Sequence, residues 1–117
     1  MSINSFPRRE RLSLKVRISQ VFKKGRRCSC EGISLFVLPN NAGCNRFLCT
    51  FRRGFGNAVE RNRVRRVFKE IYRQNKWCLK TNFDIIVLPS NSFLKEKNDF
   101  AVQSASFLKI LKKLGLA

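Results

Sequence analysis

The stretch that decides the fold is residues 54–74, GFGNAVERNRVRRVFKEIYRQ. Asn57 is a favourable helix N-cap, and Glu60 follows three residues later, as in a capping box. The spacing therefore predicts a helix from about Ala58 to Gln74. Its apolar residues recur at i, i+3, i+4, i+7 and i+8, which is typical of a helix packed on a sheet. They are Val64, Val67, Phe68, Ile71 and Tyr72.

The segment Gly54-Phe55-Gly56 allows two interpretations. A phosphate-binding loop is the weaker one, because no Gly-Lys-Ser/Thr follows and no third glycine comes at dinucleotide-binding spacing. We expect instead a turn that starts the helix.

Three short apolar runs predict β-strands. They are Ile33 to Leu38, Phe47 to Phe51, and Phe83 to Leu88. We expect the first two to pair antiparallel as a long hairpin across the Asn-Asn-Ala-Gly loop at residues 40–43.

Two further helices are expected. The first runs from about Ser13 to Lys24 and stops at Gly25, and the last starts near Asn98 or Asp99 and is capped by Gly115. The residues expected to face inward are Leu14, Ile18, Val21 and Phe22 in the first helix, and Val102, Ala105, Leu108, Leu111 and Leu114 in the last.

The resulting order, α-β-β-α-β-α, predicts the α+β class, as a two-layer sandwich of helices against a small sheet. The pattern leaves the topology of the second crossover open. A chain of 117 residues suits a single domain, 1–117. Within it, residues 1–10 are expected to form a flexible basic arm.

The charge balance indicates a polyanionic partner. Lys and Arg number 25 against 7 Asp and Glu, a formal net charge of +18. Such self-repulsion opposes compaction, so nucleic acid is the first candidate and an anionic membrane surface is the rival. No run approaches the roughly 20 apolar residues needed to span a bilayer. We expect a cytoplasmic protein.

The residues present argue against a self-contained active site. The chain has no histidine, so no Ser-His or Cys-His nucleophile and no His general base can form. The seven carboxylates are scattered. A structural zinc site would need thiolates at irregular spacing, and we expect no metal and no cofactor in the protein itself. The five cysteines, expected to be reduced, are Cys28, Cys30, Cys44, Cys49 and Cys78.

The face of the predicted helix opposite its apolar stripe is basic. At about 100° per residue, five polar side chains share an arc of about 100°, and Arg61 and Arg63 flank it. Arginine matches phosphate well, so this face is a candidate for nucleic-acid binding. The five are Asn62, Arg65, Arg66, Lys69 and Arg73.

Two aromatic residues could stack on unpaired bases. Phe22 lies at the edge of the first helix's apolar stripe, and Phe36 lies on the strand face opposite Ile33, Leu35 and Val37. An aromatic side chain beside arginines can stack on bases. Core packing is the ordinary alternative for each.

The run GNAVERNRVRR, residues 56–66, closely resembles the signature of the bacterial ribonuclease P protein component. Its centre is Arg61-Asn62-Arg63, then one residue and two basic ones. The Arg11-Leu12 pair with the later Phe22 and Gly25 resembles that family's first helix. FRR at 51–53 resembles its second strand and basic turn, and FDIIVLP at 83–89 its third strand. The resemblance covers about residues 8 to 115.

This resemblance implies a left-handed β-α-β crossover, the fold of the ribosomal protein S5 domain 2 type. It also implies a subunit of the endoribonuclease ribonuclease P, in which a catalytic RNA with bound Mg²⁺ removes the 5′ leader of precursor tRNA and the polypeptide alone is not catalytic. The expected partners are that RNA and precursor tRNA, with no membrane and no DNA.

The resemblance also assigns roles by position. The residues implied to contact the catalytic RNA are Arg61, Asn62, Arg63, Arg65, Arg66 and Lys69. Those implied to line a groove for the single-stranded leader are Arg11, Phe22, Phe36, Thr50, Arg52 and Arg53. Two positions depart from the family pattern: Ile18 stands where a second aromatic is common, and Gly54 where a Lys or Arg is common.

Three alternatives remain open. A ribosomal or general RNA-binding protein has the same composition, and only the signature separates it. A DNA-binding protein would insert the arginine helix into a major groove, but strands flank that helix where a helix-turn-helix needs a second helix. A protein-only nuclease would need clustered acidic metal ligands.

Overall fold

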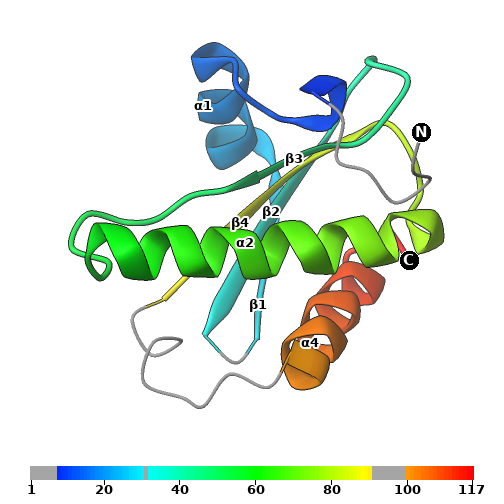
Figure 1. Ribbon diagram of the computed structural model, residues 1–117. Coiled ribbons are helices and arrows are strands. Elements are labelled where there is room, and N and C mark those ends of the chain that lie inside the picture. The colour runs from blue at the N-terminus through cyan, green and yellow to red at the C-terminus, as the bar shows by residue number, and fades with distance from the viewer. Residues whose placement is uncertain (1–7, 31, 91–99) are drawn as a thin grey trace.

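The computed structural model describes residues 8–30, 32–90 and 100–117. The elements form one small sheet with helices packed on it (Figure 1), so the predicted α+β class is confirmed. In chain order they are η1 (Arg8–Glu10), α1 (Lys15–Lys24), β1 (Arg26–Cys30), β2 (Ile33–Pro39), β3 (Arg46–Cys49), α2 (Ala58–Asn75), η2 (Lys76–Cys78), β4 (Phe83–Pro89) and α4 (Phe100–Lys113).

The sheet has four strands in the order β1-β2-β4-β3. Antiparallel pairs join β1 to β2 and β2 to β4, whereas β3 and β4 are parallel. The predicted hairpin between residues 33–38 and 47–51 is therefore wrong, because β4 lies between those two strands. Every residue from Asp84 to Pro89 is buried. A strand covered on both faces has a continuous apolar run, and this property of β4 suits the inner position.

Strand β1 was missed by the sequence analysis. Its sequence, RRCSC, has no apolar alternation, and its side chains are exposed or half-buried. The strand exists because it pairs with β2 in register from Arg26 opposite Val37 to Cys30 opposite Ile33. Gly25, as predicted, ends α1. A Cβ there would lie 2.4 Å from the Val21 carbonyl oxygen and 2.8 Å from that of Val37, so only glycine fits between α1 and β2.

The parallel pair β3 and β4 is joined by α2, which crosses the face of the sheet. In Figure 1, β3 lies above β4, both run toward the left, and α2 runs back in front of them. This arrangement is the left-handed crossover that the family resemblance implied.

The two faces of the sheet carry different helices. Ile33, Leu35 and Val37 project to one face, where they pack against buried residues of α2 and α4. Phe36, Ile86 and Leu88 project to the other face, where Val21 of α1 and Leu12 cover them. Helix α1 thus adds a partial third layer opposite α2 and α4.

The buried residues of α1 and α4 differ in part from those predicted to face inward. Helix α1 begins at Lys15, so Leu14 is its N-cap residue and remains exposed, while Val21 is fully buried. In α4, Ala105 is exposed, and Phe107, Ile110 and Leu111 are buried, as is Leu114 just after the helix. The side chain of Val102 and the predicted start at Asn98 or Asp99 lie outside the described residues. Gly115, with φ of 81°, caps α4 as predicted.

The prediction of a flexible arm over residues 1–10 does not hold for Arg8–Glu10. Residues 1–7 lie outside the described residues, but Arg8–Glu10 form η1, and Glu10 is buried. Its carboxylate accepts a hydrogen bond of 3.1 Å from the Tyr72 hydroxyl and pairs with Lys76 at 3.4 Å. The Leu12 N–H then donates to the Phe47 carbonyl at 3.1 Å, so this segment is bound to α2 and β3.

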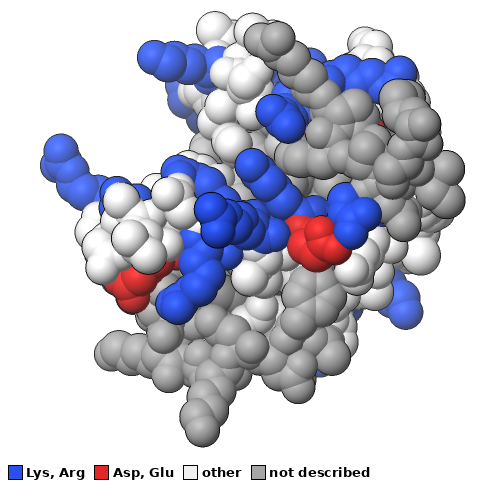
Figure 2. All heavy atoms as spheres, in the orientation of Figure 1, with Lys and Arg blue, Asp and Glu red and all other residues white. Residues whose placement is uncertain are grey.

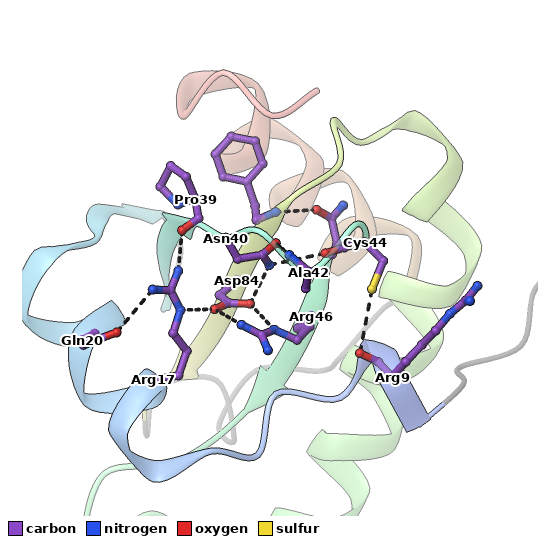
Figure 3. Close-up of polar contacts among 11 residues, drawn as sticks. Arg9, Arg17, Gln20, Pro39, Asn40, Ala42, Cys44, Arg46 and Asp84 are labelled. Carbon is purple, nitrogen blue, oxygen red and sulfur yellow. Dashed lines mark hydrogen bonds and ion pairs between the residues drawn. The ribbon is translucent and has the colours of Figure 1, made fainter.

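A buried carboxylate connects α1, β3 and β4. Asp84 of β4 is completely buried and accepts from Arg17 Nε at 2.5 Å, Arg46 Nε at 2.7 Å and Asn40 Nδ2 at 2.8 Å (Figure 3). Arg17 also donates to the Pro39 carbonyl at the end of β2. Burial raises the pKa of Asp84, but the hydrogen bonds from Arg46, Arg17 and Asn40 outweigh it and hold the pKa below its ordinary value.

We predict that Asp84→Asn lowers the free energy of unfolding by about 3 kcal/mol at neutral pH, because two half-buried guanidinium groups lose their buried counter-charge. A carboxylate with a lowered pKa contributes stability above its unfolded pKa of about 3.9 and loses it as pH falls through the folded value. The difference between the two proteins should therefore shrink below about pH 4. Urea unfolding followed by circular dichroism measures both effects.

The matched control for this prediction is Glu70→Gln, which removes the carboxylate of a half-exposed ion pair, that of Glu70 with Arg73. It should cost no more than about 1 kcal/mol. Equal losses for the two variants at neutral pH would contradict the structural role of Asp84.

Candidate nucleic-acid interface

The start of α2 is fixed by the capping box predicted from the sequence. The Asn57 side chain accepts from the Glu60 N–H at 2.9 Å, and the Glu60 carboxylate accepts from the Asn57 N–H at 3.0 Å. The preceding turn needs glycines, because φ is 87° at Gly54 and 43° at Gly56. The turn interpretation is thereby confirmed. It also explains Gly54, where a Lys or Arg would be strained.

The exposed face of α2 is basic, as the helical spacing predicted. Figure 2 shows Lys and Arg side chains gathered over this helix, with few acidic atoms among them. Asn62, Arg63, Arg66 and Lys69 are exposed.

Three arginines of the helix have partners within the protein. Arg65 is half-buried and donates to the Asn62 side chain at 3.3 Å. Arg61 donates to the carbonyls of Phe55 and Gly56, both at 3.3 Å, so part of its role is to hold the turn. Arg73 pairs with Glu70, which offsets its charge.

A hollow of about 270 Å³ lies beside α1, and we call it the Phe22 hollow. Four of the six residues implied for the leader groove meet there. Its lining residues are Phe22, Phe36, Thr50, Phe51, Arg52 and Leu88. The Phe22 and Phe36 rings meet edge to face with centroids 4.8 Å apart.

The other two implied residues lie elsewhere. Arg53 is exposed in the turn before α2 and does not line the hollow. Arg11 instead lines a second hollow of about 250 Å³ beside β3, the outer strand of the sheet; we call it the β3-edge hollow, and Arg65 and Lys69 line it too. The implied grouping of Arg11 with Phe22 and Phe36 is therefore not what the structure shows.

The two aromatic candidates differ in exposure. Phe22 is 37% exposed, whereas Phe36 is only 8% exposed and packs against Val21 and Ile86. Core packing, the alternative that the sequence left open, thus accounts for most of Phe36. Ile18 is half-buried against the same cluster, so this departure from the family pattern serves the core.

Two residues of this surface were missed. Arg27 of β1 lies over the Phe36 ring, with its guanidinium carbon 5.5 Å from the ring centroid. This contact could not be predicted without β1, because the pairing of β1 with β2 places Arg27 directly opposite Phe36. Phe51 stacks on Phe55 at 4.5 Å and receives the Arg65 guanidinium at 5.1 Å. Its position at the end of an alternating run was the available signal.

The described residues contain no group of three or more His, Cys, Asp or Glu side chains able to hold a metal ion. The five cysteines are unpaired thiols. Burial raises the pKa of Cys49 to about 12, although Arg65 and Lys69 act in the opposite direction. None of the described helices is long and apolar enough to cross a bilayer.

Comparison with known proteins identifies the family. The profile of the family described as Ribonuclease P matches residues 6–115. The chain belongs to the ribonuclease P protein family. It is 34% identical to the ribonuclease P protein component of Petrotoga mobilis over 116 residues, covering 97% of this chain and 98% of that relative. It is 33% identical to that of Thermotoga maritima over 112 residues, or 94% and 96% of the two chains.

Solved structures agree with this assignment. The ribonuclease P protein of Thermotoga maritima superposes with a TM-score of 0.81 at 31% identity, covering 89% of this chain and 96% of that one. The ribonuclease P protein of Staphylococcus aureus gives a TM-score of 0.75 at 22% identity, with 92% and 96% covered, which supports the fold alone.

We predict that Phe36→Ala lowers the free energy of unfolding by about 3 kcal/mol, because it leaves a cavity in the core under α1. Phe22→Ala should cost only about 1 kcal/mol, since its ring is partly exposed already. Urea unfolding of both variants measures the difference. Similar losses would mean that the two rings do not differ in burial as described.

Proposed function

We propose that this chain is the protein subunit of ribonuclease P, which binds the catalytic RNA and the 5′ leader of precursor tRNA and so promotes endonucleolytic removal of the leader. Family membership supports the assignment. One contact carries the proposal for this chain. Arg65 of the basic face lies over the ring of Phe51, which lines the Phe22 hollow. The candidate surfaces for the two RNAs are therefore continuous.

The basic face of α2 suits the catalytic RNA. Asn62, Arg63, Arg66 and Lys69 extend outward, and the described residues of α2 carry only two carboxylates, of which Glu60 caps the helix and Glu70 pairs with Arg73. Exposed arginines bind the phosphates of a duplex without demanding a base sequence. We propose that Arg61 contributes mainly by holding the turn.

The Phe22 hollow suits a single strand. The partly exposed ring of Phe22, the hydroxyl group of Thr50 and the guanidinium group of Arg52 line one hollow. Stacking combined with charge binds unpaired nucleotides with little sequence preference. Mature tRNA lacks the leader, so this hollow would distinguish the precursor from the product.

Bond cleavage is assigned to the RNA. Each of the described carboxylates accepts a hydrogen bond from, or forms an ion pair with, a neighbouring residue of the fold. They belong to Glu10, Glu60, Glu70 and Asp84. This donor set does not fit a divalent ion, so we assign the magnesium ions that the reaction requires to the catalytic RNA. The protein's contribution is to position the substrate and to neutralise phosphate charge.

Reconstitution tests the proposal. We expect a 5′-labelled precursor tRNA to be cut at the mature 5′ end, at low magnesium concentration, by bacterial ribonuclease P RNA together with this protein. Protein alone should not cut, and RNA alone should cut poorly. Tight RNA binding without any stimulation of cleavage would instead indicate a general RNA-binding protein.

We predict that Arg66→Ala lowers the slope of log K against log salt for catalytic-RNA binding by about 0.7–0.9, which corresponds to one lost phosphate contact. Arg65→Ala should lower it similarly. Arg73→Ala on the same helix is the matched control and should leave the slope nearly unchanged, because Glu70 already pairs with that guanidinium. Filter binding at several salt concentrations gives the slopes, and equal slopes for all three variants would refute the phosphate assignment.

We predict that Phe22→Ala weakens binding of precursor tRNA to the reconstituted holoenzyme by about tenfold, since stacking contributes about 1–3 kcal/mol per base. Affinity for mature tRNA should not change. Val16→Ala is the control, because Val16 is 74% exposed on α1 and does not line the hollow. Equal losses for precursor and mature tRNA would exclude a leader-binding role for Phe22.

A further inference from the structure

The β3-edge hollow combines an apolar floor with a cationic rim. Leu12, Phe47, Leu48 and Cys49 supply the floor, while Arg11, Arg65 and Lys69 supply the rim. No carboxylate lines it. Its volume of about 250 Å³ is below the roughly 300–1,000 Å³ of pockets that enclose drug-sized ligands. The hollow therefore suits a small group with an apolar part and an attached anion.

The edge of β3 adds backbone hydrogen-bonding groups to this hollow. The Thr50 N–H donates to the Val87 carbonyl at 3.0 Å, so Thr50 faces β4. Alternation along the strand then directs the N–H and C=O of Cys49 to the opposite side. On that same side the Leu12 N–H donates to the Phe47 carbonyl at 3.1 Å. The segment Arg11–Leu12 thus covers the edge at Phe47, and the peptide groups of Cys49 come next.

The cations of the rim come from separate elements, and their electric field reaches the residues of the floor. Arg11 belongs to the segment bridged to β3, whereas Arg65 and Lys69 lie one turn apart on α2. Arg65 is held by Asn62 and by the Phe51 ring. Both α2 cations lower the pKa of Cys49 against the effect of burial, so their field reaches the floor.

We propose that the β3-edge hollow binds one unpaired nucleotide of an RNA, with the base on the apolar floor against the Cys49 peptide groups and its phosphate among Arg11, Arg65 and Lys69. A nucleobase edge offers adjacent donors and acceptors that match a backbone N–H and C=O. The inference rests on the proposed function only in taking RNA as the partner.

A peptide strand is the competing occupant, because an open sheet edge can pair with one. The edge is unfavourable for it, since Arg11–Leu12 already occupy the position beside Phe47. The peptide groups of a single residue, Cys49, together with three cations, fit one nucleotide better than an extended chain.

Two RNAs could supply the nucleotide. The hollow adjoins the basic face of α2 through Arg65 and Lys69, which is the surface proposed for the catalytic RNA. It also adjoins the Phe22 hollow, because Cys49 lines one and Thr50 and Phe51 line the other. The leader and the catalytic RNA share the same chemistry here, and the experiment separates them.

The first arm titrates the ¹⁵N-labelled protein with adenosine 5′-monophosphate, inorganic phosphate and adenosine, observed by NMR. We expect the monophosphate to shift the amide of Cys49 together with Arg65 and Lys69, and phosphate alone to shift only the rim. An unshifted Cys49 amide, or an identical response to inorganic phosphate, would overturn the proposal. So would an acidic extended peptide that shifts Cys49 when the nucleotide does not.

The second arm uses Arg11→Gln, Lys69→Gln and the double variant, with Arg66→Gln as a control outside the hollow. Each single change should weaken monophosphate binding about fivefold, and the double variant should lose less than the product, because both cations bind one phosphate. Full additivity, or an equal effect of Arg66→Gln, would contradict the shared site.

The same variants then identify the source. A loss of affinity for the catalytic RNA caused by Arg11→Gln, which lies outside the basic face of α2, assigns the nucleotide to that RNA. A loss of affinity for precursor tRNA but not for mature tRNA assigns it to the leader. If both affinities are unchanged, the proposal is overturned. Reconstituted cleavage by the unaltered protein is scored separately, so failure of the nucleotide site is distinguishable from failure of the proposed function.

Discussion

The carboxylate of Asp84 determines where α1 lies on the sheet. It accepts from Arg17 of α1 and from Arg46 of β3, while Arg17 also reaches the end of β2 at Pro39. A buried charge with two guanidinium partners tolerates little displacement, because removing one partner leaves an uncompensated charge. Phe22 is on the same helix as Arg17. The ion pairs of Asp84 near the start of α1 therefore set the position of the Phe22 ring near its end.

The part of the fold that local signals control was predictable from the sequence. The cap at Asn57 and Glu60 and the stripe from Val64 to Tyr72 depend only on near neighbours along the chain, and both are confirmed. Strand pairing depends on distant partners. The sequence RRCSC forms a strand only because β2 lies beside it, and the hairpin across residues 40–43 failed because β4, more than 30 residues later in the chain, pairs with β2 instead.

The candidate site was predictable by residue type, and less so by arrangement. The helical spacing placed Arg63, Arg66 and Lys69 on an exposed face, as observed. Charge counting could not show that Arg17 and Arg46 are paired within the fold, since their shared partner, Asp84, is distant in sequence and reaches them only through tertiary contacts. The family resemblance grouped Arg11 with Phe22, and this placement also depends on a tertiary contact. The bridge between Arg11 and Phe47 directs it to another edge of the sheet.

The strand order has a consequence for how the chain acquires its structure during synthesis. Strand β4 lies between β2 and β3 in space, although it follows both in sequence. Until residues 83–89 leave the ribosome, β2 and β3 expose apolar faces and unpaired edges, which are the features that promote aggregation of nascent chains. The sheet closes late through contacts of long sequence separation, and such closure is intrinsically slow. A polyanion bound early to the arginines of α2 would reduce charge repulsion during this interval and thereby favour folding.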